Sequence, residues 1–443
     1  MYQFLKCHKA QHVSLLLLAG PMILSNITVP LLGLVDTAVI GHMDQAHYLA
    51  GIALGSSSIS VLFWLASFLR MSTTGVIAQA HGQQDSAALA RALLTSILIA
   101  LMFAVTLIAL SPLLISVMAQ LSDSSSEVLE QAERYFQIRV FSAPAAMVNL
   151  VLLGFMLGMH YGRGPFYLVL FTNCINIALD ILFVVGFDWG VAGAAWASLI
   201  ADYAALGLAC YLTLQVAKKQ QLSLTLKWPS RAQWLSLLSL NRDIFIRSLI
   251  LQLCFSFMTF YGARLGETTL AANSVLLNFL MLVSFALDGI AYAAEAKVGK
   301  AKGEQDVSQL HMWVKISLFW GTAFALLYCL LFIFAGGFII RLLTSIPAVI
   351  QHAETFLPWL MVLPLVAMAC FLFDGVFVGL TRAAAMRNSM VIAALCGFFL
   401  PLWLAREFDN HGLWLAMSCF MAMRGLTLAL IYLRLYRMQR LLD

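Results

Sequence analysis

The chain repeats one plan in its two halves. Residues 80–85 read Ala-His-Gly-Gln-Gln-Asp and residues 301–306 read Ala-Lys-Gly-Glu-Gln-Asp, 221 positions later in a chain of 443. Shifts of 219 to 221 also pair Gly41 with Gly262, Leu89 with Leu310, Pro144 with Pro364 and Gly193 with Gly412. A duplicated chain folds as two similar units, and duplication inside a membrane protein is typical of secondary transporters.

The composition places this duplicated chain in a membrane. Hydrophobic residues make up 62% of the sequence and charged residues 11%, against about 25% charged in an ordinary soluble domain. A spanning helix needs about 20 mostly apolar residues. We predict an all-α integral membrane protein with twelve transmembrane helices, at about 12–40, 49–78, 87–118, 128–159, 165–187, 191–217, 241–264, 268–298, 307–343, 348–380, 385–406 and 411–437.

The twelve predicted helices divide into two pseudo-symmetric six-helix lobes. We assign residues 1–217 to the N-terminal lobe, 218–240 to a linker and 241–443 to the C-terminal lobe. Lysine and arginine concentrate in alternate loops and in the linker. Short positive loops stay on the cytoplasmic side. We therefore expect a multi-pass protein of a bacterial inner membrane with both termini and the linker in the cytoplasm, and two repeats related by an axis along the membrane normal.

Several function classes lack their usual residues in this sequence. The eight cysteines are scattered without a Cys-x-x-Cys pair, and the histidines form no His-Glu-x-x-His motif. A Gly-x-x-x-x-Gly-Lys-Ser/Thr phosphate loop is also missing. The net charge of +5 comes from residues at helix ends instead of one basic patch, which argues against a nucleic-acid partner. We expect neither an enzyme nor a bound cofactor.

Acidic residues inside the predicted spans are the first candidates for function. A charged side chain at bilayer depth costs at least about 2.5 kcal/mol, so it indicates a functional site or a buried partner. Asp36 lies in the first predicted helix, after Pro21 and Pro30. Each proline removes a backbone hydrogen bond and tends to kink a helix. We expect the first helix to bend at these prolines.

Asp180 belongs to a polar stripe on the fifth predicted helix. At 100° per residue, Asn173 and Asn176 fall on the same face as Asp180, and Asn149 adds a buried amide in the fourth helix. Each asparagine alone could simply hydrogen-bond between helices. The group together favours a site that couples transport to a proton or a cation. Sodium is an alternative ion, because Asp36, Asn149, Asn176 and Asp180 offer hard oxygen ligands.

The second half has acids of its own. Asp288 and Glu295 are seven positions apart on one face of the eighth helix, and Asp374 lies among phenylalanines in the tenth. These three residues either form a second site or serve the structure, since Glu295 could pair with Lys297 or reach water. For Arg247, we expect snorkelling or pairing with an acid instead of ligand contact.

Several stretches resemble the multidrug and toxic compound extrusion (MATE) family, and within it the DinF-type branch. They are residues 21–42, which read PMILSNITVPLLGLVDTAVIGH, the turn at 80–85, Asn241-Arg242-Asp243, Asp374-Gly375 and Thr381-Arg382-Ala383. The resemblance covers essentially the whole chain. It implies a V-shaped pair of six-helix lobes with a central cleft, and export of organic compounds in exchange for protons or sodium ions.

The resemblance also implies roles for individual residues. It carries the family's cation-coupling residues onto Asp36, Asn149, Asn176 and Asp180, and the bend of the first helix onto Pro21. Another branch of the family adds a glutamate in the seventh helix. Here that helix has no acid beyond Asp243, so the resemblance does not extend to a sodium site of that kind.

These observations predict a secondary multidrug transporter. We expect proton-coupled antiport of amphipathic, mostly cationic organic compounds by alternating access, in a chain that acts as a monomer in the bilayer. Shared protonation of Asp36 and Asp180 would remove the charge that attracts a cationic substrate. The alternatives are a sodium-coupled antiporter of the same family and a flippase for lipid-linked precursors. A flippase would need a strongly cationic cavity, whereas the buried charges identified above are mainly acidic.

Overall fold

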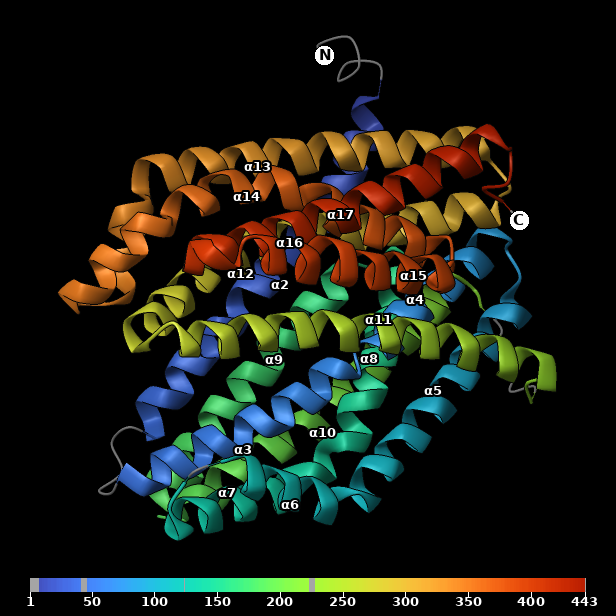
Figure 1. Cartoon of the computed structure of the whole chain (residues 1–443). Helices are drawn as coiled ribbons and strands as arrows, with labels where there is room; N and C mark the ends of the chain where they lie inside the picture. The colour runs from blue at the N-terminus through green and yellow to red at the C-terminus, as the bar shows by residue number, and fades with distance from the viewer. Residues whose placement is uncertain (1–7, 41–45, 123, 223–227, 443) are drawn as a thin grey trace. The chain divides into compact units, whose positions relative to one another are not determined.

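The structure, a computed structural model, describes residues 8–40, 46–122, 124–222 and 228–442; for residues 29–40, 46, 47, 49 and 121 it describes the backbone alone. Its elements within these ranges are all helical, and twelve helices are long and apolar enough to cross a membrane. Figure 1 shows these helices along the chain. In a bilayer a helix satisfies its own backbone hydrogen bonds, which is why apolar segments of this length adopt it. The predicted all-α fold with twelve spans is confirmed.

One compact unit comprises residues 24–238. Its largest helix contacts join α4 with α8 and α3 with α7, which are distant in the chain, and α9 with α10, which follow each other. The elements of this unit that follow α2 (Lys9–Ile40) are α3 (Ala46–Leu65), α4 (Phe68–Gly82), α5 (Ser86–Ala109), α6 (Ser111–Leu121), α7 (Ser126–Arg139), η1 (Val140–Ser142), α8 (Ala143–Gly158), α9 (Arg163–Asp180), η2 (Ile181–Gly186) and α10 (Gly190–Lys219).

The other compact unit joins residues 1–23 to residues 239–443. Within it, α12, α13 and α14 make the largest contacts, and α14 also packs on α17. Its elements after α2 are α11 (Arg231–Arg264), α12 (Glu267–Gly303), α13 (Val307–Leu343), α14 (Pro347–Gly379), α15 (Ala383–Ile392), η3 (Ala393–Phe399), α16 (Leu400–Leu404), η4 (Arg406–Phe408) and α17 (Asp409–Arg437). The chain thus crosses from one compact unit to the other twice, once within α2 and once near the start of α11. The predicted lobes, by contrast, have a single boundary, in the linker.

Side-chain contacts explain why the start of α2 belongs to the second unit. Lys297 Nζ on α12 donates to Ser14 Oγ at 2.9 Å, and Trp320 Nε1 on α13 donates to His12 Nδ1 at 3.1 Å. A Cβ at Gly289 would lie 2.4 Å from Ile23. The absence of a side chain at this glycine therefore allows α12 to approach the first helix closely.

The internal repeat is visible in two identical turns. Asp85 caps α5 by accepting from the backbone N–H of Ala88 at 2.9 Å, and Asp306 caps α13 by accepting from Gln309 at the same distance. The residue before each cap adopts a left-handed conformation, with φ of 56° at Gln84 and 59° at Gln305. The repeated Gly-x-Gln-Asp pattern therefore encodes a helix stop followed by a helix start.

Two glycine pairs also repeat at a shift of 221. Gly154 and Gly158 on α8 face α4, where added Cβ atoms would lie 2.6 Å from Arg70 O and 2.8 Å from the Ile77 side chain. Gly375 and Gly379 on α14 face α12, where they would lie 2.4 Å and 2.5 Å from backbone oxygens. Each Gly-x-x-x-Gly pair lets two helix backbones approach closely, as is typical of membrane helices.

Candidate functional site

The polar stripe of α9 is buried within the unit formed by residues 24–238. Asp180 is 3% exposed and Asn176 is 4% exposed, while Asn173 is half-buried. Asn176 Nδ2 donates to Ser198 Oγ on α10 at 3.2 Å. Directly after Asp180, the α-helix gives way to the π-helical turn η2. Such turns often occur at functional sites in helices, and this one ends the regular helix at the buried acid.

Tyr135 on α7 joins this stripe to a second group of polar residues. Its side chain is 6% exposed and forms hydrogen bonds with Ser198 and with Arg139, and it lies within the electrostatic reach of Asp180. Apolar side chains of α3, η2 and α10 surround the ring: Ile52, Val184, Val191, Ala194 and Ala195. Tyr135 is therefore a polar bridge through an otherwise apolar helix contact.

Beyond Tyr135 lies an ion pair between α7 and α10. Arg139 Nη1 donates to Asp202 Oδ2 at 2.5 Å, and these side chains are 15% and 17% exposed. Arg139 also donates to Ser142 Oγ, and its guanidinium lies 5.6 Å from the centre of the Phe63 ring. Asn149 Nδ2 on α8 donates to the backbone oxygen of Asp202 at 3.1 Å.

The structure brings several of the predicted coupling residues together. Asn176 and Asp180 share one buried face, while Asn149 is half-buried and bonds to the backbone of Asp202 at the neighbouring ion pair. The side chains of Asp36 and Pro30 lie outside the described residues, although both positions fall within the α2 helix. The roles of these residues, and bending at Pro21, stay predictions.

Sequence reasoning missed Tyr135, Arg139, Ser198 and Asp202. The signal for the ion pair was present, because Arg139 and Asp202 are opposite charges inside predicted spans. A charge in a span indicates a partner or a site. Tyr135 and Ser198 gave no such signal, since tyrosine and serine are common in membrane helices and only the packing of α7 against α10 brings these two together.

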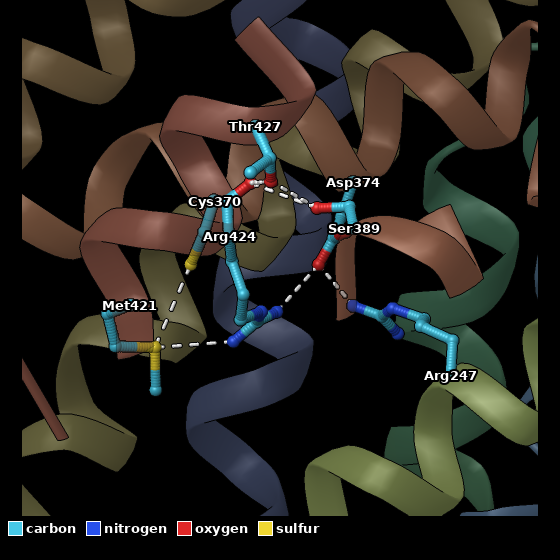
Figure 2. A network of polar contacts seen from close by, with 7 residues as sticks. All are labelled: Arg247, Cys370, Asp374, Ser389, Met421, Arg424 and Thr427. Atoms are coloured by element: carbon cyan, nitrogen blue, oxygen red, sulfur yellow. Dashed lines mark hydrogen bonds and ion pairs between the residues drawn. The ribbon is translucent and has the colours of Figure 1, made fainter. Parts of the chain in front are cut away.

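A second buried charge cluster lies within the other unit. Figure 2 shows Asp374 of α14 between two arginines, with Arg247 of α11 on one side and Arg424 of α17 on the other. Both guanidinium groups donate to Asp374 Oδ2, that of Arg424 at 2.8 Å. Arg424 Nη1 also lies 3.2 Å from Met421 Sδ. Of the two alternatives predicted for Arg247, snorkelling or pairing with an acid, the structure shows the pairing, whereas Arg424 was not singled out.

The other acids predicted in this half lie on α12. Asp288 is half-buried and interacts electrostatically with Arg424, while Glu295 is only 1% exposed. Lys297, the suggested partner of Glu295, donates to Ser14 and lies 5.0 Å from the centre of the Trp313 ring. Among the described residues, no three His, Cys, Asp or Glu side chains are grouped as metal ligands.

A family model supplies the deciding comparison. The MatE model matches residues 21–182 and 244–403, so it matches each repeat once and covers most of the chain. The chain belongs to the MATE family. It is a multi-pass membrane transporter of that family.

Curated relatives place this MATE protein in the predicted DinF-type branch. It is 47% identical to the DNA damage-inducible protein F of Escherichia coli, over 95% of this chain and 92% of that protein. It is 24% identical to a probable multidrug resistance protein NorM of Idiomarina loihiensis, over 98% of this chain and 96% of that one.

Solved structures confirm the fold of this MATE chain. A Vibrio cholerae MATE transporter superposes with a TM-score of 0.87 at 20% identity, covering 98% of this chain and 99% of that one. A MATE structure described as bent gives a TM-score of 0.87 at 18% identity, covering 97% and 96%. Identities this low support the shared helical architecture alone.

Proposed function

We propose that this MATE transporter exports amphipathic, mostly cationic organic compounds in exchange for protons by alternating access. The observation that carries the proposal is Asp180, an acid 3% exposed in a mainly apolar span, which shares a helix face with Asn176 and lies within the electrostatic reach of Tyr135. A relative's name, probable multidrug resistance protein, supports the substrate class. We also propose an inner-membrane location with cytoplasmic termini, and a monomer as the working unit.

The proposed mechanism uses the carboxyl group of Asp180 as a proton carrier. Burial disfavours a charge, so a proton from the outer side is held readily once the site opens outward. Protonation turns the carboxylate into a neutral acid, which no longer attracts a cationic substrate. Release of the proton toward the cytoplasm restores the charge and the affinity for the next cation.

The neighbours of Asp180 orient this carrier without taking up the proton themselves. Asn176 donates to Ser198, and Tyr135 connects Ser198 with Arg139. Asp36 on α2 is the proposed partner acid, and Pro21 and Pro30 on the same helix are its proposed bending points. Because α2 passes from one compact unit to the other after residue 23, a change in its bend would involve both units.

The charge balance around Asp374 favours coupling in the first repeat. Asp374 Oδ2 already accepts hydrogen bonds from two guanidinium groups. A substrate cation or sodium ion would therefore meet two fixed positive charges there. The cluster of residues 176, 180 and 198, by contrast, offers oxygen atoms, which are also the ligands of hard cations such as sodium.

The test is transport in proteoliposomes. Efflux of a fluorescent lipophilic cation is measured under an imposed pH gradient, with and without a sodium gradient. We expect proton-driven efflux that is lost in Asp180→Asn and in Asp36→Asn. Asp188→Asn, in the exposed loop that follows the same helix, is the matched control and keeps native transport.

The other possible outcomes of this experiment contradict the proposed coupling site, coupling ion or substrate. Proton-driven efflux that survives in Asp180→Asn and Asp36→Asn refutes the proposed coupling site. Dependence on the sodium gradient assigns sodium as the coupling ion. Translocation of a lipid-linked headgroup without cation efflux would support the flippase instead.

A further inference from the structure

We infer that Arg139 and Asp202 are positioning residues that set the pH at which the Asp180 site exchanges its proton. The inference rests on the proposed function, because it assigns Asp180 the role of proton carrier. It adds to that carrier a neighbouring ion pair between α7 and α10. Its basis is the ion pair between Arg139 and Asp202 and the hydrogen bond between Arg139 and Tyr135, which lies within the electrostatic reach of Asp180.

Arg139 is held in one place by contacts on several sides. Its guanidinium donates to Asp202 and to Ser142, forms a hydrogen bond with Tyr135 and lies against the Phe63 ring. These partners come from α3, α7, η1 and α10. A guanidinium fixed by this many contacts is a stationary positive charge, since it cannot swing toward water when its surroundings change.

Tyr135 places this stationary charge close to the proton carrier. The tyrosine forms a hydrogen bond with Arg139, and its ring lies within the electrostatic reach of Asp180. Interactions between charges are weakly screened in a buried site. The charge at Arg139 therefore acts on the carboxyl group of Asp180 across a single side chain.

While both members of the pair are charged, their effects on Asp180 have opposite signs and oppose each other. Other described titratable groups at this contact are Tyr135 itself and the half-buried Tyr48, which packs on the same apolar cluster from α3. On α8 the nearest polar group is the amide of Asn149, which is neutral. Neutralising one member of the pair therefore leaves one uncompensated charge near the carrier.

This arrangement predicts shifts of opposite sign. In Arg139→Gln the remaining negative charge of Asp202 favours the protonated carrier, so the pH for half-maximal efflux rises. In Asp202→Asn the remaining positive charge of Arg139 favours the ionised carrier, so that pH falls. A charge about one side chain away shifts a titration by roughly one pH unit. The double variant R139Q/D202N returns to the native midpoint.

The experiment measures efflux as a function of pH in proteoliposomes for the two single variants, the double variant and Arg139→Lys. Arg139→Lys keeps the positive charge, so we expect the native pH for half-maximal efflux. The control is Glu133→Gln, an exposed position on the same helix. Opposite shifts that cancel in the double variant support the inference. Shifts of the same sign, or native midpoints in both single variants, overturn it, because a merely structural pair lowers activity without moving the midpoint.

A swapped pair covers the case in which a single variant does not fold. R139E/D202R keeps an ion pair but puts the negative charge beside Tyr135, so the midpoint rises; an unchanged midpoint overturns the inference. Asp180→Asn is measured in parallel. If it keeps proton-driven efflux, the proposed function fails. If it loses efflux while the charge variants leave the midpoint unmoved, only this inference fails.

Discussion

Replacing Asp374 by asparagine tests whether the cluster in Figure 2 is a structural ion pair or a second coupling site. The substitution keeps the size of the side chain and removes its charge. Arg247 and Arg424 are 8% and 3% exposed, so their guanidinium groups stay buried after the change. We expect a loss of stability of roughly 3–5 kcal/mol, the usual cost of removing one partner from a buried ion pair.

Replacing Arg247, one of the two arginines that pair with Asp374, gives a stability loss for comparison. Arg247→Met leaves Asp374 paired with Arg424, whose Nη2 donates to it at 2.8 Å. We expect this variant to lose only the hydrogen bond to a charged group, about 1.5–3 kcal/mol at most. For a unit of this size, each kcal/mol lowers the melting temperature by about 2–4 °C. Asp374→Asn should therefore melt about 6–20 °C below the native protein, and Arg247→Met clearly less.

The assay is thermal unfolding of the purified protein in detergent, followed by tryptophan fluorescence. The control is Glu407→Gln, an acid-to-amide change at an exposed position of the same unit. Efflux is measured below the melting temperature, where we expect Asp374→Asn to keep the native dependence on pH. A variant that melts like the native protein but loses proton-driven efflux would refute the structural role and make Asp374 a coupling residue.

Two further predictions concern the repeated scaffold. Gly375→Ala puts a Cβ 2.4 Å from the backbone oxygen of Ala291, so α14 and α12 must separate. We expect a loss of about 1–3 kcal/mol, measured by thermal unfolding. The control Gly20→Ala, with no atom within 4 Å, does not lower the melting temperature, because alanine favours a helix more than glycine does. Asp306→Ala removes the cap on the N–H of Gln309 and should cost about 1 kcal/mol; an unchanged melting temperature would show that water replaces the cap.

The architecture could be predicted because its causes are local. Apolar segments of spanning length form helices in a bilayer whatever their neighbours are, and the turn at 80–85 carries its own cap and left-handed residue. The buried network could be predicted only in part. Asp180 was apparent as a charge in a span, whereas the role of Tyr135 depends on how α7 and α9 both pack against α10. Local sequence patterns do not determine which helices, distant in the chain, pack against each other.

The two repeats share a scaffold but differ in their charges. The glycine pairs and helix caps recur at a shift of 221. At the local shifts, however, Asp374 corresponds to Leu153, and Asp202 corresponds to Met421. The acid of each ion pair therefore has an uncharged counterpart at the equivalent position of the other repeat. This asymmetry separates the surroundings of the two acids: in the second repeat two guanidinium groups pair directly with Asp374, while in the first repeat Arg139 pairs with Asp202 and reaches Asp180 only across Tyr135. The carboxyl group that we propose as the proton carrier is therefore the one that is not held between two arginines.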